Sequence, residues 1–171
     1  QDTIADEFVR RVSERVRDLQ VGPGVQPGIQ IGPLVEPKAV ENAVRLVREA
    51  EARGATVVTG GDAIPGSGSF FQPTVLDRVS ADMSVAVEEI FGPILAVQRF
   101  STEAEAVALA NETEYGLVGY VYTQDVKRGQ RMIDLVDTGM MGLNVGVLSN
   151  AAGPFGGVKR SGLGREGGAE G

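Results

Sequence analysis

The side chains of this chain that could take part in chemistry are carboxylates, hydroxyls, amides and amines, because the 171 residues include no cysteine and no histidine. The absence of cysteine excludes disulfides and thiolate metal sites. The absence of histidine removes the commonest general base and metal ligand. We therefore predict no metal site, and any catalysis by the chain itself would have to use Ser, Lys, Tyr, Asp or Glu.

Two adjacent acids, Glu88 and Glu89, precede an Ile-Phe pair and a Gly-Pro turn in EEIFGP (88–93). Neighbouring residues point in different directions, so the two carboxylates do not form an acid–base pair. One interpretation is a solvated helix end with one acid exposed. The other is a carboxylate at a turn that accepts hydrogen bonds from a sugar diol, with Phe91 packed beside it.

The second unusual stretch is PFGGVKRSGLGRE (154–166), which follows LNVGVLSN (143–150). Gly156 and Gly157 allow a close approach of the backbone to a neighbouring group, and Phe155 is a lone aromatic residue. The sequence is equally compatible with a tight crossing that buries Phe155 and with a loop that forms the wall of a pocket. Asn144, Ser149 and Asn150 follow a predicted strand, at the end where α/β sheets bind ligands; polar loop residues without a ligand are the alternative.

Two further patterns are given no functional weight. GLGREG (162–167) matches G-x-G-x-x-G, but nothing follows it to build a βαβ unit, so we predict a glycine-rich turn. Asn111-Glu112-Thr113 is a glycosylation sequon by pattern alone.

The elements that must position these residues alternate between helices and strands. Apolar spacing, caps and turn residues predict helices over 4–19, 37–54, 102–111 and 125–139, and strands over 55–59, 70–76, 93–100, 117–123 and 140–145. Thr102 and Asp125 are the expected N-caps of the last two helices. Pro73 predicts an edge or irregular position for its strand, since proline donates no ladder hydrogen bond.

Apolar periodicity also predicts which helix faces are buried. In the first helix the predicted inward face is Ile4, Phe8, Val12, Val16 and Leu19. In the last helix it is Val126, Ile133 and Val136.

The strand–helix alternation predicts an α/β fold with a mostly parallel, doubly wound sheet flanked by helices, forming a single domain over 1–171. A net charge of −7 argues against a nucleic-acid or anionic-membrane partner. No apolar run is long enough for a bilayer span, and the polar start QDTIADEF shows no signal peptide. We expect a cytoplasmic location.

Three motifs, in order and spacing, resemble the signatures of the aldehyde dehydrogenase superfamily: EEIFGP (88–93), NETEYGLVGYVYT (111–123) and PFGGVKRSGLGRE (154–166). The similarity covers essentially the whole chain. GLNVGVLSNAAGPFGG (142–157) is most similar to the succinate-semialdehyde dehydrogenase branch.

The resemblance implies a catalytic-domain fold and a known chemistry. In the family a Cys thiolate attacks the aldehyde, hydride passes to NAD or NADP, and a Glu base activates water. Both the Cys and the Glu would lie upstream of Gln1, and the Cys would belong to a Gly-Gln-x-Cys segment. The resemblance therefore implies that this chain holds no catalytic residue, is truncated at both ends, and is inactive alone.

Four residues match binding positions of the family. Glu89 matches the acid that binds the nicotinamide ribose, and Phe91 matches the aromatic residue beside the nicotinamide; Glu88 is expected to be structural. Phe155 matches the aromatic lining of the substrate tunnel. Ser149 matches a position that helps bind the distal carboxylate of succinate semialdehyde.

The resemblance further implies a small aldehyde substrate and a homo-oligomeric parent, and exposed apolar surface would let the isolated chain self-associate. One alternative is a natural stand-alone, non-catalytic module that assembles with a full-length dehydrogenase. An esterase-like remnant is disfavoured, because the esterase activity of the family also uses the Cys.

Overall fold

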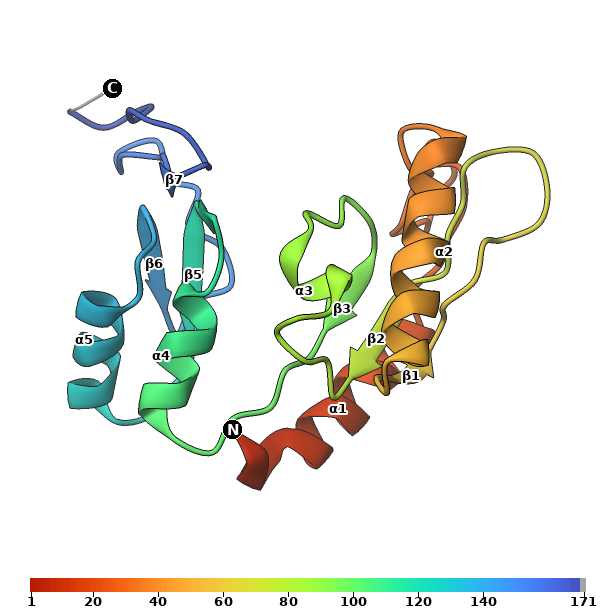
Figure 1. The fold of residues 1–171 in the computed structure, drawn as a ribbon. Coiled ribbons are helices and arrows are strands. Elements are labelled where there is room, and N and C mark those ends of the chain that lie inside the picture. The colour runs from red at the N-terminus through yellow and green to blue at the C-terminus, as the bar shows by residue number, and fades with distance from the viewer. Residues whose placement is uncertain (170–171) are drawn as a thin grey trace. The chain divides into compact units, whose positions relative to one another are not determined.

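The computed structural model describes residues 1–169, which fall into two compact units, 1–101 and 102–169. Both units contain helices and strands, which Figure 1 colours along the chain from red to blue. Each unit is described by itself. The single domain over 1–171 stays a prediction.

The first unit is built on a three-stranded sheet with β2 in the centre. β2 pairs antiparallel with β1 and parallel with β3. The elements of this unit are α1 (Asp2–Arg17), α2 (Pro37–Ala52), β1 (Thr56–Thr59), β2 (Thr74–Asp77), α3 (Ser84–Val87) and β3 (Ile94–Ala96).

The core of the first unit forms where α2 covers this sheet. Proline at the first position of α2 needs no hydrogen-bond partner for its nitrogen, which suits a helix start. The buried residues of α2 recur at helical spacing and pack with side chains of the sheet and its flanking loops. The fully buried side chains of this cluster include Ala43, Leu46, Val47, Ala50 and Leu76.

The strand with Pro73 was expected to be an edge strand or an irregular one. The edge position is wrong, because Pro73 lies just before β2 and β2 is the central strand, but the pairing of β2 with β1 is irregular, with a register shift between Val57 and Thr59. The ladder begins at Thr74, whose N–H donates to the Pro93 carbonyl at 2.8 Å. All four residues of β2 are buried. Proline is therefore compatible with the central strand here, since no ladder donor is lost.

The predicted inward face of α1 is also wrong. The buried residues are Ala5, Val9 and Ser13, whereas Ile4 is 61% exposed and Phe8 is exposed as well. Ala5, Val9 and Ser13 form a stripe of small side chains, and α1 contacts β1 and β2. Small residues let a helix approach a sheet closely, and the sequence periodicity alone does not choose between two adjacent stripes.

The second unit contains α4 (Glu103–Asn111), β4 (Tyr115–Gly116), β5 (Val118–Val121), α5 (Val126–Leu135), β6 (Met140–Leu143) and β7 (Val158–Lys159). The predicted caps are confirmed: Thr102 Oγ1 accepts from the Glu105 N–H at 3.2 Å, and Asp125 Oδ1 accepts from the Arg128 N–H at 3.1 Å. β5 and β6 are parallel, and β4 and β7 are antiparallel.

The predicted inward face of α5 needs correction, because the buried residues of this helix are Gly129 and Met132 while Val126 is exposed. A Cβ on Gly129 would lie 2.9 Å from Leu143 Cδ1. The glycine therefore brings α5 close to β6. That close contact, rather than the apolar periodicity, sets the orientation of the helix.

The predicted α/β class with helices flanking the sheets is confirmed. Within residues 1–169 the strands form three separate sheets, β1-β2-β3, β4-β7 and β5-β6, instead of one doubly wound sheet. Two of the four pairings are parallel and two are antiparallel. None of the helices described is both long and apolar enough to cross a bilayer.

An ion-pair network joins three segments of the first unit. Arg99 donates from Nε to Asp77 Oδ1 at 3.0 Å and from Nη2 to Asp77 Oδ2 at 2.6 Å. Its Nη2 also contacts Asp6 Oδ1 of α1 at 2.7 Å. The side chains of Arg99 and Asp77 are only 18% and 9% exposed. Hydrogen bonds from Arg99 are the main reason that the pKa of Asp77 lies below its usual value.

Replacement of Asp77 by Asn should destabilise the chain by about 2 kcal/mol at pH 7, since the bidentate pair with Arg99 is lost. The lowered pKa means that this contribution is present above the ordinary value of 3.8 and is lost as the pH falls through the folded-state value. The difference in unfolding free energy between the wild type and Asp77→Asn should therefore shrink below that pH. Urea unfolding at a series of pH values measures it.

The exposed Asp18 provides the control, since its carboxylate makes no ion pair among residues 1–169. Asp18→Asn should change the unfolding free energy little at any pH. A pH-independent difference for Asp77→Asn would contradict the ion-pair account.

Candidate functional site

The turn after α3 fixes one acid and leaves the next one free. Glu88 is the C-cap of α3, with its N–H donating to the Ser84 carbonyl at 2.8 Å, and its carboxylate pairs with Arg45 of α2. Glu89 is exposed and makes no hydrogen bond or ion pair among the described residues. The structure thus gives Glu88 a structural contact, and the Glu89 carboxylate keeps its full capacity to accept hydrogen bonds.

Phe91 follows in the same turn with an unusual backbone. Its φ is +46°, a value that bulky residues rarely adopt, and its side chain is 76% exposed. The flanking residues hold the turn: Ile90 packs against the core, and the Ile94 N–H donates to the Gly92 carbonyl at 2.8 Å. The fold therefore presents an apolar ring to the outside.

A free carboxylate and an exposed ring two residues apart have complementary binding properties. The carboxylate accepts hydrogen bonds from vicinal hydroxyls, and the ring offers a flat apolar surface. The cofactor-binding role expected for Glu89 and Phe91 stays a prediction.

In the second unit, residues 155–166 fold back on themselves. Phe155 and Glu166 exchange two backbone hydrogen bonds, each 2.7 Å long. Glycines make the crossing possible, because a Cβ on Gly156 would lie 2.4 Å from the Gly164 carbonyl oxygen. A Cβ on Gly139, which precedes β6, would lie 2.1 Å from the Gly156 oxygen. No side chain fits at these positions unless the backbone moves.

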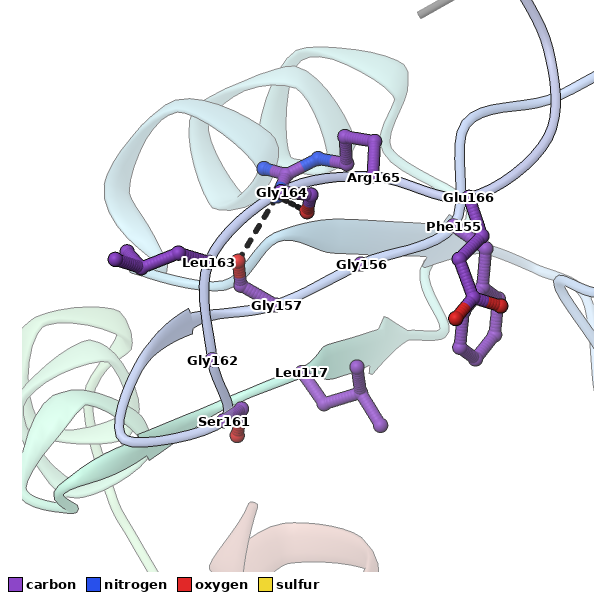
Figure 2. Close-up of a pocket in the computed structure, with 10 residues that line it drawn as sticks. All are labelled: Leu117, Phe155, Gly156, Gly157, Ser161, Gly162, Leu163, Gly164, Arg165 and Glu166. Atoms are coloured by element: carbon purple, nitrogen blue, oxygen red, sulfur yellow. Dashed lines mark hydrogen bonds between the residues drawn. The ribbon is translucent and has the colours of Figure 1, made fainter. Parts of the chain in front are cut away.

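Polar side chains stabilise the folded loop of residues 155–166 by hydrogen bonds. Arg165 Nη1 donates to the Gly157 carbonyl at 2.9 Å and to the Gly164 carbonyl at 2.8 Å, the dashed lines of Figure 2. Ser161 Oγ accepts from the Gly116 N–H of β4 at 2.9 Å. Lys159 Nζ donates to the Asn111 and Thr113 carbonyls at 3.2 Å. The loop is therefore tied both within itself and to β4 and the end of α4.

The folded loop lines an open pocket of about 270 Å³ (Figure 2). Phe155 is 41% exposed, so its ring is not buried in a core. Of the two interpretations of this stretch, the loop that walls a pocket is the one the structure supports. The lining residues are Leu117, Phe155, Gly156, Gly157, Ser161, Gly162, Leu163, Gly164, Arg165 and Glu166.

Ser149 lies apart from the lining of this pocket. It is exposed in the segment between β6 and β7. The start of that segment is fixed by Asn144, whose side chain accepts from the Thr123 N–H and donates to the Thr123 carbonyl, both at 2.9 Å. The structure brings Glu89 and Phe91 together in one turn of the first unit, and it places Ser149 and Phe155 in one connection of the second.

Sequence reasoning missed the residues that close the pocket, namely Leu117, Ser161, Leu163 and Arg165. The available signal was an arginine among three glycines in GLGREG (162–167), a pattern judged only as a nucleotide fingerprint. That stretch forms turns with no helix after it in the described residues, which confirms the predicted turn. The same turn supplies half of the pocket wall.

Two other candidate features are resolved by the geometry. The side-chain amide of Asn111 donates to the Leu135 carbonyl at 2.9 Å and accepts from the Asp137 N–H at 2.8 Å, so the sequon asparagine links α4 to the end of α5. Residues 1–169 contain no group of three or more carboxylates arranged to hold a metal ion.

Comparisons with known proteins identify the family of the chain. A family model described as the aldehyde dehydrogenase family matches residues 1–171. The chain is 46% identical to a succinate-semialdehyde dehydrogenase of Paenarthrobacter nicotinovorans over 100% of the chain and 38% of that protein. It is 42% identical to a glutarate-semialdehyde dehydrogenase of Pseudomonas aeruginosa, over 98% of the chain and 35% of that protein.

A solved structure of an NADP-dependent enzyme from Escherichia coli superposes with a TM-score of 0.95 at 43% identity, over 98% of the chain and 35% of that structure. The chain thus spans about a third of the length of the relatives it matches. The match over the full chain shows that this protein belongs to the aldehyde dehydrogenase family.

Proposed function

We propose that this chain is part of an NAD(P)-dependent aldehyde dehydrogenase that oxidises succinate semialdehyde, or a similar short semialdehyde, to the carboxylic acid. The observation that carries the proposal is the 46% identity, over the whole chain, to a succinate-semialdehyde dehydrogenase. Two features support the proposal. The pocket beside Phe155 offers an apolar wall to the aldehyde, and the free carboxylate of Glu89 offers a hydrogen-bond acceptor to the cofactor.

The cofactor role falls to Glu89 and Phe91. When bound, NAD(P)⁺ supplies the hydride acceptor. The Glu89 carboxylate accepts hydrogen bonds from the ribose hydroxyls, and Phe91 contacts the nicotinamide side. The ion pair between Arg45 and Glu88 keeps the neighbouring acid out of this role and anchors the turn to α2.

The substrate role falls to Phe155 and Ser149. Phe155 provides an apolar wall beside Leu117 and Leu163 for the carbon chain of the aldehyde. The Ser149 hydroxyl donates a hydrogen bond to the distal carboxylate that succinate and glutarate semialdehydes both carry. A neutral hydroxyl binds an anion more weakly than an arginine does, so Ser149 is one of several groups at that end.

The catalytic groups of the reaction lie outside these 171 residues under this proposal. The sequence has no cysteine to supply a thiolate nucleophile, and the chain spans about a third of its relatives. The parent enzyme, defined as the product of the reading frame that contains these residues, is proposed to be an oligomer. Exposed apolar side chains such as Ile4, Phe8 and Val35 fit surfaces that other polypeptide covers.

The isolated 171-residue chain should produce no NADH or NADPH from succinate semialdehyde, because it lacks the nucleophile. Absorbance at 340 nm, with NAD⁺ and NADP⁺ tested separately, measures this. A full-length succinate-semialdehyde dehydrogenase in the same assay serves as the positive control. Cofactor reduction by the pure chain would show that its own residues suffice.

Glu89→Gln in the parent enzyme should raise the KM for NAD(P)⁺ about tenfold, since a charged acceptor of ribose hydroxyl hydrogen bonds is replaced by a neutral one. The KM for the aldehyde should change little. Glu41→Gln is the matched control, since the Glu41 side chain is exposed on α2 and makes no ion pair among residues 1–169. Equal cofactor KM values for Glu89→Gln and the wild type would remove Glu89 from the cofactor site.

Ser149→Ala in the parent enzyme should raise the KM for succinate semialdehyde about threefold, the loss expected for one neutral hydrogen bond. Butanal, which has the same chain length and no carboxylate, should be oxidised with an unchanged KM. Initial rates over a range of each aldehyde give both constants. An equal increase for both aldehydes would contradict a role in carboxylate binding.

A further inference from the structure

We propose that Arg165 is a positioning residue for the aldehyde, acting through Phe155 by bracing the two arms of the pocket loop. The inference deepens the proposed function and rests on it. The arms are residues 155–157 and 164–166, which run from the two ends of the loop toward its tip. Arg165 lies on one arm and bonds to carbonyls on both.

The geometry of the brace is specific. One nitrogen, Nη1, donates to the Gly157 carbonyl on the first arm at 2.9 Å and to the Gly164 carbonyl on the second at 2.8 Å. A charged donor to a neutral carbonyl makes a stronger hydrogen bond than an uncharged one. Arg165 is partly buried and forms no ion pair among residues 1–169, so these carbonyls are its partners. Figure 2 shows the guanidinium bridging the loop.

The arms have few other means of holding together. Gly156, Gly157 and Gly164 have no side chains that could interlock across the loop, and glycine-rich backbone loses much entropy when it is ordered. The remaining link is the pair of 2.7 Å hydrogen bonds between Phe155 and Glu166. Because Arg165 directly precedes Glu166, movement of Arg165 displaces the partner that holds the Phe155 backbone. The position of the ring at the pocket wall therefore depends on the brace.

Arg160 in the same loop is a natural control. Its side chain is 72% exposed and pairs with Glu114 at 2.9 Å, and it does not line the pocket. Removing its charge leaves the carbonyls of both arms and the Phe155 backbone untouched. A comparison of the two arginines separates the brace from the general effect of losing a positive charge.

The test uses Arg165→Met, Arg165→Lys and Arg160→Gln in the parent enzyme. Arg165→Met should raise the KM for succinate semialdehyde about tenfold, while kcat and the KM for NAD(P)⁺ stay within about twofold. Arg165→Lys keeps a charged donor and should recover part of the loss. Arg160→Gln should match the wild type.

A double-mutant cycle with Phe155→Ala tests the route of the effect. If Arg165 acts through Phe155, then Arg165→Met should add less than about a twofold change in the presence of Phe155→Ala. A purely structural role would give additive effects. Additive effects, or an unchanged aldehyde KM in Arg165→Met, would overturn the proposal.

Hydrogen exchange measured on peptides covering 154–166 tests whether Arg165 holds the arms together, and this readout does not depend on enzyme activity. Arg165→Met should speed exchange at the Phe155 and Glu166 amides, and Arg160→Gln should not. Unchanged protection in Arg165→Met would overturn the brace. If the parent enzyme oxidises no semialdehyde, the proposed function fails, and the exchange data still report on whether Arg165 holds the arms together.

Discussion

The pocket depends on a backbone crossing that is too close for any side chain. A Cβ atom on Gly156 would clash with the Gly164 carbonyl oxygen. A Cβ atom on Gly139 would clash with the Gly156 carbonyl oxygen. This constraint brings the two arms of the loop together, lets Phe155 and Glu166 exchange hydrogen bonds, and leaves room for Arg165 to bond across the gap. This crossing is the physical reason for glycine at positions 139 and 156.

The other candidate site is built on a different principle. There a bulky residue, Phe91, adopts a backbone conformation that is normally left to glycine, and the surrounding core and sheet hold it there. Glu88 is fixed by Arg45 while Glu89 keeps a free carboxylate. Under the proposed function, one unit contributes contacts to the dinucleotide and the other contributes a pocket for the aldehyde. This division agrees with a chain that contributes binding groups to an enzyme of the aldehyde dehydrogenase family.

Local signals in the sequence predicted what local physics decides. Thr102 and Asp125 cap their helices as expected, because capping needs only residues within one turn. The buried face of α1 was predicted wrongly, since Ala5, Val9 and Ser13 are chosen by contact with the sheet rather than by their own hydrophobicity. β7 and the Arg165 brace escaped prediction for the same reason: their partners lie outside the local sequence window. The motif resemblance, by contrast, identified the family across the full chain.

Under the proposed function, these residues supply binding groups to an enzyme whose nucleophile lies elsewhere in the same polypeptide. The most direct measurement is the nucleotide sequence that precedes the codon for Gln1 in the source. The account predicts a continuous reading frame that encodes a Gly-Gln-x-Cys segment shortly upstream. A stop codon in frame just before Gln1, or an upstream frame that encodes no cysteine, would contradict it.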